Sequence, residues 1–456
     1  MISRNVGVAV LFAGAMALGG CSTVSAVGDA AGKLVPSFAK KNKPQEVAGE
    51  GQRISIIAFD QRVEAAEALK GADFFLPPAL PQAEWPQPGG LGEFNVENVQ
   101  AAPDFEIAWR RGFGKGSDRA FHITTGPIIA GGRAYVMDAT TDVAAIDAQT
   151  GEIIWKKSFH PRTKRDKDGF GGGIAFADGK LYVSSGFRLV AQLDAATGAV
   201  GWTHKTDSPV HGAPVVSHGR MFVVSTDNEL LTYDTASGTP GWTYQALVEP
   251  ARILSSSSPA LSGNTVVAAF ASGEVVALST ANGNDLWNST LSKASRTTAL
   301  SEIRDVAGRP VIHQGDVYAA SHGGVFASTD LRTGQARWSL PVASIDTPLP
   351  AGDVVYLISQ AGEVICASRE SGQVYWIKDL NAGVKKSKDR ALFSGPVLAS
   401  DRLVVVSTDG RAIALNPKTG DVLKTLKIGS AVLTSPVAAN GMIYVVTDKG
   451  ELVAIK

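Results

Sequence analysis

The amino-acid sequence predicts an all-β protein, an eight-bladed β-propeller whose ring is closed by a strand from the N-terminal side of the repeats. Three observations predict this fold. A short motif ending in tryptophan recurs along residues 105–456, and each copy follows short alternating segments typical of β-hairpins. The last copy lacks one strand, which an isolated segment upstream can supply. We call the four strands of a repeat A, B, C and D in chain order.

Strand A is short, and in most repeats a proline heads it. A proline has no backbone N–H, so it is tolerated where one row of backbone groups lacks a partner, as at the inner edge of a blade. In one repeat Gly173 takes this place. The prolines are Pro127, Pro214, Pro259, Pro310, Pro348, Pro396 and Pro436.

Strands B and C are predicted to form a hairpin in each repeat. Residues 402–417 show the pattern most clearly, because two runs of alternating apolar residues flank the pair Asp409-Gly410. Alternation with period two indicates strands, and an Asp-Gly pair between them is typical of a tight turn.

Strand D follows a turn of the pattern Asp-x-x-Thr-Gly and carries tryptophan four residues after the glycine. The tryptophans at this position are Trp155, Trp202, Trp242, Trp287, Trp338 and Trp376. A further copy, ending in Gly420, has Lys424 instead. A large aromatic side chain at one fixed position buries roughly 150–250 Å². We therefore expect these tryptophans to pack between blades as core rather than to bind a cofactor.

The final repeat, residues 435–456, stops after strand C. Its missing strand D can come from residues 107–113, an isolated segment that carries Trp109 just before the first strand A. An open ring would leave edge strands available for aggregation. We therefore expect residues 107–113 to pair with residues 451–456 and to complete the eighth blade.

The N-terminal residues 1–20 are predicted to be a lipoprotein signal peptide. The apolar run Val6–Leu18 is too short to cross a membrane but suits a signal peptide. Small residues before Cys21 resemble the bacterial lipobox, which implies lipidation of Cys21; an ordinary secretory signal is the alternative. Ser22, rather than aspartate, then favours the outer membrane. We expect residues 21–104, an irregular lipidated arm, to lie along the propeller or to stay partly mobile.

Composition and motifs point away from nucleic acid and from catalysis. The 456 residues contain 43 Lys and Arg and 43 Asp and Glu, so there is no positive surplus for phosphate binding. The histidines show no His-x-His or HExxH spacing for zinc, and no G-x-S-x-G motif indicates a serine hydrolase. Cys366 reads as a buried small hydrophobe. We predict no enzyme, no metal and no cofactor.

The connections from strand D to the next strand A offer a binding surface. They are uneven in length, and long loops on a rigid scaffold are the usual place for recognition. Two of them flank the fourth blade, and we expect apolar residues with a charged rim there, as in interface hot spots; local packing is the alternative. Two other long connections are basic and are expected to be solvated. The predicted partner-binding residues are Ala251, Arg252, Ile253, Leu254, Arg304 and Asp305.

The repeat Asp-x-x-Thr-Gly-x-x-x-Trp resembles the quinoprotein (PQQ-like) propeller repeat, in which the tryptophan packs between blades and the Asp and Thr side chains cap the C–D turn. Together with the lipobox, and without paired cysteines for a quinone site, the chain resembles the BamB family of outer-membrane assembly lipoproteins. The resemblance places the partner surface at Ala251, Ile253, Leu254 and Asp305. Leu254 stands where the family has arginine, and Ala307 replaces a second family aspartate.

This resemblance implies a periplasm-facing lipoprotein of the outer membrane that acts as a scaffold of the β-barrel assembly (BAM) complex. Its implied partner is the periplasmic part of a BamA-like barrel-insertion protein, and nascent outer-membrane proteins are possible clients. Two alternatives stay open. One is a periplasmic PQQ-dependent oxidoreductase or another ligand-binding propeller, and the other is an adhesion module at the cell surface or on peptidoglycan.

Overall fold

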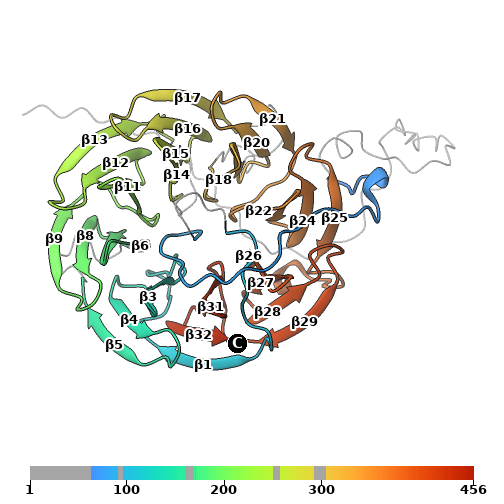
Figure 1. Ribbon diagram of the computed structural model, residues 1–456, viewed down its shortest axis with the longest axis horizontal. Coiled ribbons are helices and arrows are strands. Elements are labelled where there is room, and N and C mark those ends of the chain that lie inside the picture. Colours follow the sequence, from blue (N-terminus) through green and yellow to red (C-terminus); the bar gives the residue numbers. More distant parts are fainter. Residues whose placement is uncertain (1–62, 91–95, 160–168, 170, 250–256, 292–304) are drawn as a thin grey trace, which may run out of the picture. The chain divides into compact units, whose positions relative to one another are not determined.

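The computed structural model describes residues 63–90, 96–159, 169, 171–249, 257–291 and 305–456. In this part of the chain, eight four-stranded antiparallel sheets follow one another around a ring (Figure 1). The predicted eight-bladed β-propeller is therefore confirmed. Its only described helices are the 3-10 turns η1 (Glu67–Leu69) and η4 (Ser387–Asp389), neither of which has the length to cross a membrane.

The first four blades follow the predicted order of strands A to D. Blade 1 has β2 (Ile128–Ala130), β3 (Arg133–Met137), β4 (Val143–Asp147) and β5 (Ile153–Lys157). Blade 2 has β6 (Gly172–Ala177), β7 (Lys180–Ser185), β8 (Leu189–Asp194) and β9 (Val200–Lys205). Blade 3 has β10 (Val215–Ser217), β11 (Arg220–Val224), β12 (Glu229–Asp234) and β13 (Pro240–Gln245). Blade 4 has β14 (Ala260–Ser262), β15 (Thr265–Ala269), β16 (Glu274–Ser279) and β17 (Asp285–Thr290).

The remaining blades repeat the same order, except that the last takes its outer strand from the other end of the repeats. Blade 5 has β18 (Val311–His313), β19 (Asp316–Ala320), β20 (Phe326–Asp330) and β21 (Ala336–Leu340). Blade 6 has β22 (Leu349–Ala351), β23 (Val354–Ile358), β24 (Glu363–Ser368) and β25 (Val374–Asp379). Blade 7 has β26 (Phe393–Ala399), β27 (Arg402–Ser407), β28 (Arg411–Leu415) and β29 (Val422–Lys427). Blade 8 has β30 (Val437–Ala439), β31 (Met442–Val446), β32 (Glu451–Ile455) and β1 (Ile107–Gly112).

Strand β1 closes the ring as predicted. It pairs antiparallel with β32, with Trp109 opposite Ala454 and Gly112 opposite Glu451. Two backbone hydrogen bonds between Glu106 and Lys456, of 3.1 and 2.8 Å, continue the pairing to the chain end. The eighth blade thus has all four strands, although no continuous chain segment joins its strand C to its strand D.

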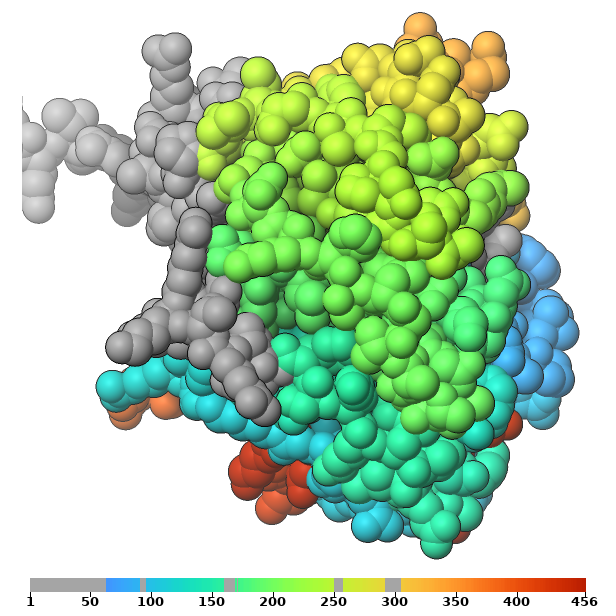
Figure 2. Space-filling view, turned by 90° about the vertical axis from the view of Figure 1, so that its left-hand side faces the viewer, coloured from blue at the N-terminus to red at the C-terminus, as the bar shows by residue number. Residues whose placement is uncertain are grey.

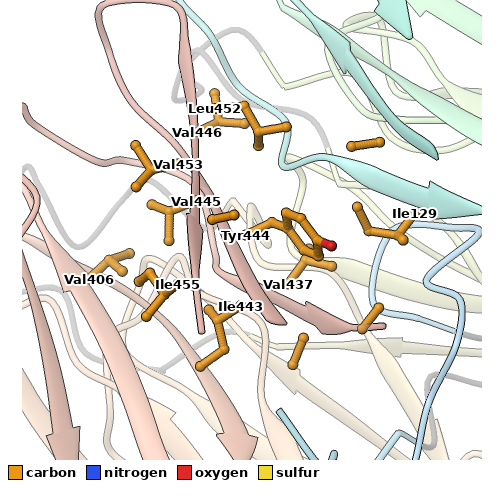
Figure 3. Close-up of a cluster of buried hydrophobic side chains, with 14 of the residues drawn as sticks. Ile129, Val406, Val437, Ile443, Tyr444, Val445, Val446, Leu452, Val453 and Ile455 are labelled. Atoms are coloured by element: carbon orange, nitrogen blue, oxygen red, sulfur yellow. The ribbon is translucent and has the colours of Figure 1, made fainter. Parts of the chain in front are cut away.

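The core lies within and between the blades. Strands B and C are buried along most of their length, whereas most residues of the outer strands D are exposed or half-buried. Where blades 7, 8 and 1 meet, one buried cluster joins their side chains, and Figure 3 shows Tyr444 of β31 with Val437 of β30 and Ile129 of β2 around it. Side chains that alternate along each strand fill the space on both sides of a blade, so neighbouring blades stabilise one another.

Backbone hydrogen bonds separate the two faces of the propeller. On one face, which we call the A–B face, the C–D turn donates a backbone hydrogen bond to the A–B turn of its own blade. In blade 1, for example, Ala148 N donates to Gly132 O at 3.0 Å. On the other face, which we call the D–A face, the residue after strand D donates a backbone hydrogen bond to the B–C turn. In blade 3, for example, Ala246 N donates to Asn228 O at 3.0 Å. This assignment matches the one on which the predicted binding surface depends.

The arm upstream of β1 lies on the A–B face. Its backbone accepts hydrogen bonds from A–B turns at Phe75 O, from Asp353 N at 3.1 Å, and at Gln82 O, from Asn440 N at 2.7 Å. Trp85 exchanges two backbone hydrogen bonds with Ile129 of blade 1. Figure 1 shows the blue arm crossing the middle of the ring, and Figure 2 shows it, edge-on, along one face at the right. Residues 63–90 and 96–106 thus pack on the propeller.

The strand pairing corrects one detail of the repeat alignment. In the other blades, proline immediately precedes the strand-A residue paired with the aromatic or valine residue of strand B, such as Ile128 opposite Tyr135. In blade 2, Ala175 pairs with Tyr182, so Ile174 and not Gly173 occupies the proline position. Gly173 is needed one residue earlier because an added Cβ would lie 2.2 Å from the Cβ of Ala213.

Candidate partner-binding surface

The predicted tryptophans each cover a glycine in the next blade. A Cβ added to Gly198 would lie 2.7 Å from the Trp155 ring, and one added to Gly372 would lie 2.8 Å from Trp338. The same contact joins Trp109, Trp202, Trp242, Trp287 and Trp376 to Gly151, Gly238, Gly283, Gly334 and Gly420. All seven tryptophans therefore pack at blade boundaries.

Most of these indoles also donate a hydrogen bond to the neighbouring C–D turn. Trp202 Nε1 donates to Thr235 O at 3.0 Å, and Trp338 Nε1 donates to Arg369 O at 2.7 Å. The indole N–H of Trp109 has no hydrogen-bond partner among the described residues. The tryptophans thus have a structural role within the scaffold.

Lys424 occupies the tryptophan position at the boundary where the C–D turn is broken. It pairs with Ala414, as Trp155 pairs with Ala145. Its Nζ donates to Asp104 O at 2.8 Å, in the segment that stands in place of the C–D turn in blade 8. Lysine therefore keeps a hydrogen bond between blades 7 and 8, where no Thr-Gly turn is present for an indole to cover.

The aspartates of the repeat cap the C–D turns. Asp330 Oδ1 accepts from Thr333 N and Thr333 Oγ1, both at 2.8 Å, and these bonds hold the pKa of Asp330 below its usual value. Asp194 makes the same pair of bonds with Thr197. These carboxylates fix turns on the A–B face and are not available as ligands on the D–A face.

The described ends of the two predicted loops lie close together on the D–A face around blade 4. The first connects β13 to β14 and the second connects β17 to β18. Where they end, Ser257 Oγ lies 3.3 Å from Gly308 O and donates to it. The described residues at the ends of both loops are therefore in contact. The order of the repeats predicts this, because the two loops follow consecutive blades.

Leu247 and Val248, at the start of the first loop, are the most exposed large apolar side chains described on this face. Their exposed fractions are 69% and 79%. The backbone of Leu247 is held on both sides, because Leu247 N donates to Glu274 Oε2 at 2.8 Å and Asn228 Nδ2 donates to Leu247 O at 2.7 Å. Two apolar side chains are thus presented to solvent from a rigid stem.

Asp305 is buried rather than part of an exposed rim. Only 2% of it is exposed, and its carbonyl accepts a hydrogen bond from His322 N at 2.8 Å. The next residue, Val306, is fully buried and bonds to Phe270 O. A charge reversal at Asp305 would therefore disturb the stem of the second loop, so it is not a surface substitution.

The other predicted partner residues, Ala251, Arg252, Ile253, Leu254 and Arg304, lie outside the described residues, as does the predicted lipidation site Cys21. Of the two basic connections, the one at residues 382–390 is described and exposed throughout. The sequence could have drawn attention to Leu247 and Val248, which are apolar residues just beyond the end of β13.

The described residues contain no group of three or more His, Cys, Asp and Glu side chains that could hold a metal ion. Cys366 is fully buried in β24, and burial raises the pKa of its thiol well above the usual value. A buried thiol of this kind is a poor nucleophile, because the thiolate is the reactive form.

Comparison with known proteins agrees with this description. The family model described as "Outer membrane protein assembly factor BamB" matches residues 96–166, 139–378 and 381–456. The protein of that name from Salmonella typhimurium is 29% identical over 379 residues, covering 80% of this chain and 93% of the relative.

Solved structures share the fold. The crystal structure of BamB from Moraxella catarrhalis superposes with a TM-score of 0.65 at 20% identity, covering 76% of this chain and 98% of that one. The quinohemoprotein alcohol dehydrogenase from Comamonas testosteroni gives a TM-score of 0.64 at 16% identity, covering 87% and 83%. At these identities the two structures support the propeller fold alone.

Proposed function

Because the chain belongs to the BamB family of outer membrane protein assembly factors, we propose that it is a non-enzymatic scaffold lipoprotein in outer-membrane protein assembly. Its D–A face docks the periplasmic part of a BamA-like barrel-insertion protein. The chain is anchored in the outer membrane through Cys21 after removal of residues 1–20 and faces the periplasm. The arm at 21–104 and the propeller at 105–456 are then the two parts of the mature protein.

The exposed pair Leu247 and Val248 carries the docking proposal. A rigid, solvent-exposed apolar pair that begins a long loop has the character of an interface hot spot, since burying it releases water without ordering a flexible backbone. The arm occupies the A–B face, where Gln82 pairs with the A–B turn of blade 8 and Trp85 pairs with Ile129 of β2. Docking on the D–A face therefore leaves the arm in place.

The test is affinity capture of the tagged full-length protein from detergent-solubilised envelopes. The double substitution L247D/V248D places two charges where apolar contact is proposed, and we expect at least a tenfold loss (about 1.4 kcal/mol) of co-purified barrel-insertion protein. The matched control is V422D/L423D on the outer strand β29, where these side chains are 49% and 53% exposed. Equal recovery with L247D/V248D and the native chain, both folded by circular dichroism, would contradict the docking site.

A further inference from the structure

A cavity of about 530 Å³ lies at the centre of the ring. The innermost strands line it, with Ile128 of β2, Val311 of β18 and Val397 of β26 contributed from three sides. On the A–B face the arm forms its wall through Trp85 and Val96. A volume in this range is typical of small-molecule sites, which are usually preformed and mostly apolar.

The apolar part of the wall comes from the repeat itself. The prolines that head strand A in blades 1, 6, 7 and 8 line the cavity, together with the buried Trp85 ring. These prolines are Pro127, Pro348, Pro396 and Pro436. Since proline has no backbone N–H, this wall offers flat apolar contact and few hydrogen-bond donors.

Polar side chains also line the cavity, among them two ionisable groups and a buried hydroxyl. Arg309, just before β18, and Asp346, just before β22, both line it and are partly exposed. Thr434 lines it as well and is only 6% exposed. Its Oγ1 has no hydrogen-bond partner among the described residues. A buried hydroxyl of this kind is ready to bond a group placed in the cavity.

Two titratable groups of the cavity wall, Arg309 and Asp346, have shifted pKa values. Burial lowers the pKa of Arg309 to about 9, so the guanidinium stays protonated, and burial raises the pKa of Asp346 to about 8, so that carboxyl is mostly neutral. A protonated carboxyl can donate a hydrogen bond instead of repelling an anion.

From this juxtaposition we propose that the axial cavity binds a small organic anion, with one carboxylate or sulfonate near Arg309 and Thr434 and an apolar body against the proline wall and Trp85. The ligand enters from the D–A face, where Ile345 and Leu433, 50% and 43% exposed, line the cavity. This site is separate from the exposed pair Leu247 and Val248 and does not depend on the docking proposal.

Isothermal titration calorimetry of the full mature chain tests the proposal with three probes of one shape: 2-naphthoate, 2-naphthamide and 2-naphthylmethylamine. We expect 2-naphthoate to bind with one-to-one stoichiometry and at least tenfold more tightly than the neutral amide, with the amine weakest. R309Q should remove the preference for the anion. R332Q, which removes an exposed arginine on a C–D turn, is the matched control and should keep it.

A second variant guards against misfolding of R309Q. T434V keeps the shape of the side chain but removes its hydroxyl, and it should weaken 2-naphthoate binding several-fold at an unchanged melting temperature. No saturable binding of 2-naphthoate, or equal affinity for the acid and the amide, would overturn the proposal. So would binding that R332Q weakens as much as the two cavity variants do.

Discussion

At the scale of single residues, the repeated contact of tryptophan on glycine explains why the motif needs both. The glycines of the C–D turns have φ near +74°, a left-handed conformation that disfavours other residues, and the neighbouring indole fills the space a Cβ would need. The packing of the tryptophans between blades could be predicted from the repeat, but their contact with the turn glycines could not. The exchange of tryptophan for Lys424 could be seen in the sequence, but its bond to Asp104 depends on the broken turn.

We predict that G372A destabilises the protein more than G383A does. Both glycines have positive φ, +74° and +85°, but a Cβ at Gly372 meets Trp338 at 2.8 Å, whereas one at Gly383 meets nothing within 4 Å. Backbone strain should cost each variant about 1–2 kcal/mol, and displacement of the indole should add about 2 kcal/mol to G372A alone. Urea denaturation measures both. Equal losses would show that the ring does not press on the turn.

His313 on β18 is a buried titratable residue that sequence reasoning did not single out. It is 2% exposed, and Glu97 Oε1, 3.7 Å from its Nε2, lies beyond hydrogen-bonding distance. Burial, and to a smaller extent the Arg369 guanidinium, lowers the pKa of His313 to about 4. The folded protein therefore holds the neutral imidazole well below the pH at which the unfolded chain protonates.

The consequence is a loss of stability in mild acid. Because the unfolded chain takes up the proton near pH 6.5 and the folded chain only near pH 4, the free energy of unfolding falls as the pH drops between these values. Between pH 7 and pH 5 the native chain should lose about 2 kcal/mol more than H313L. Urea titrations of both chains at the two pH values measure this difference, and parallel losses would place the folded pKa near 6.5.

At the scale of elements, the closing strand was predictable because counting left one strand missing and one spare. The packing of the arm was not, since residues 63–90 and 96–106 have no repeat and their contacts are long-range pairings with A–B turns and with strands of the blades. The burial of Asp305 was equally hidden. A charged residue after a long loop looks exposed in sequence, and only the three-dimensional stem between blades 4 and 5 shows that it is enclosed.

Removal of β1 should open the ring. A chain that begins at residue 113 leaves β32 as an exposed edge and loses the contact of Trp109 with Gly151. We expect it to aggregate or to melt at least 10 °C lower, because an unpaired edge strand templates association. A chain that begins at residue 63 keeps the described contacts and is the control. Size-exclusion chromatography and thermal melts compare them, and a monomeric 113–456 chain with native melting would contradict closure by β1.

At the scale of the whole molecule, our proposal gives the two faces of the propeller different tasks. The arm pairs with turns on the A–B face, and this leaves the D–A face, with its uneven connections, for a partner. A net charge of zero means that long-range attraction contributes little, so recognition depends on local apolar contact. The binding face and the pair of loops remain predictions from the sequence, which did not indicate that Leu247 and Val248 would be exposed.

Photo-crosslinking in living cells tests this division most directly. A photoreactive residue at Val248 on the D–A face is compared with one at Thr197, on a C–D turn of the A–B face, each in the full-length protein. We expect the barrel-insertion protein to be crosslinked from position 248 and not from position 197. Crosslinking from position 197 alone would contradict the account.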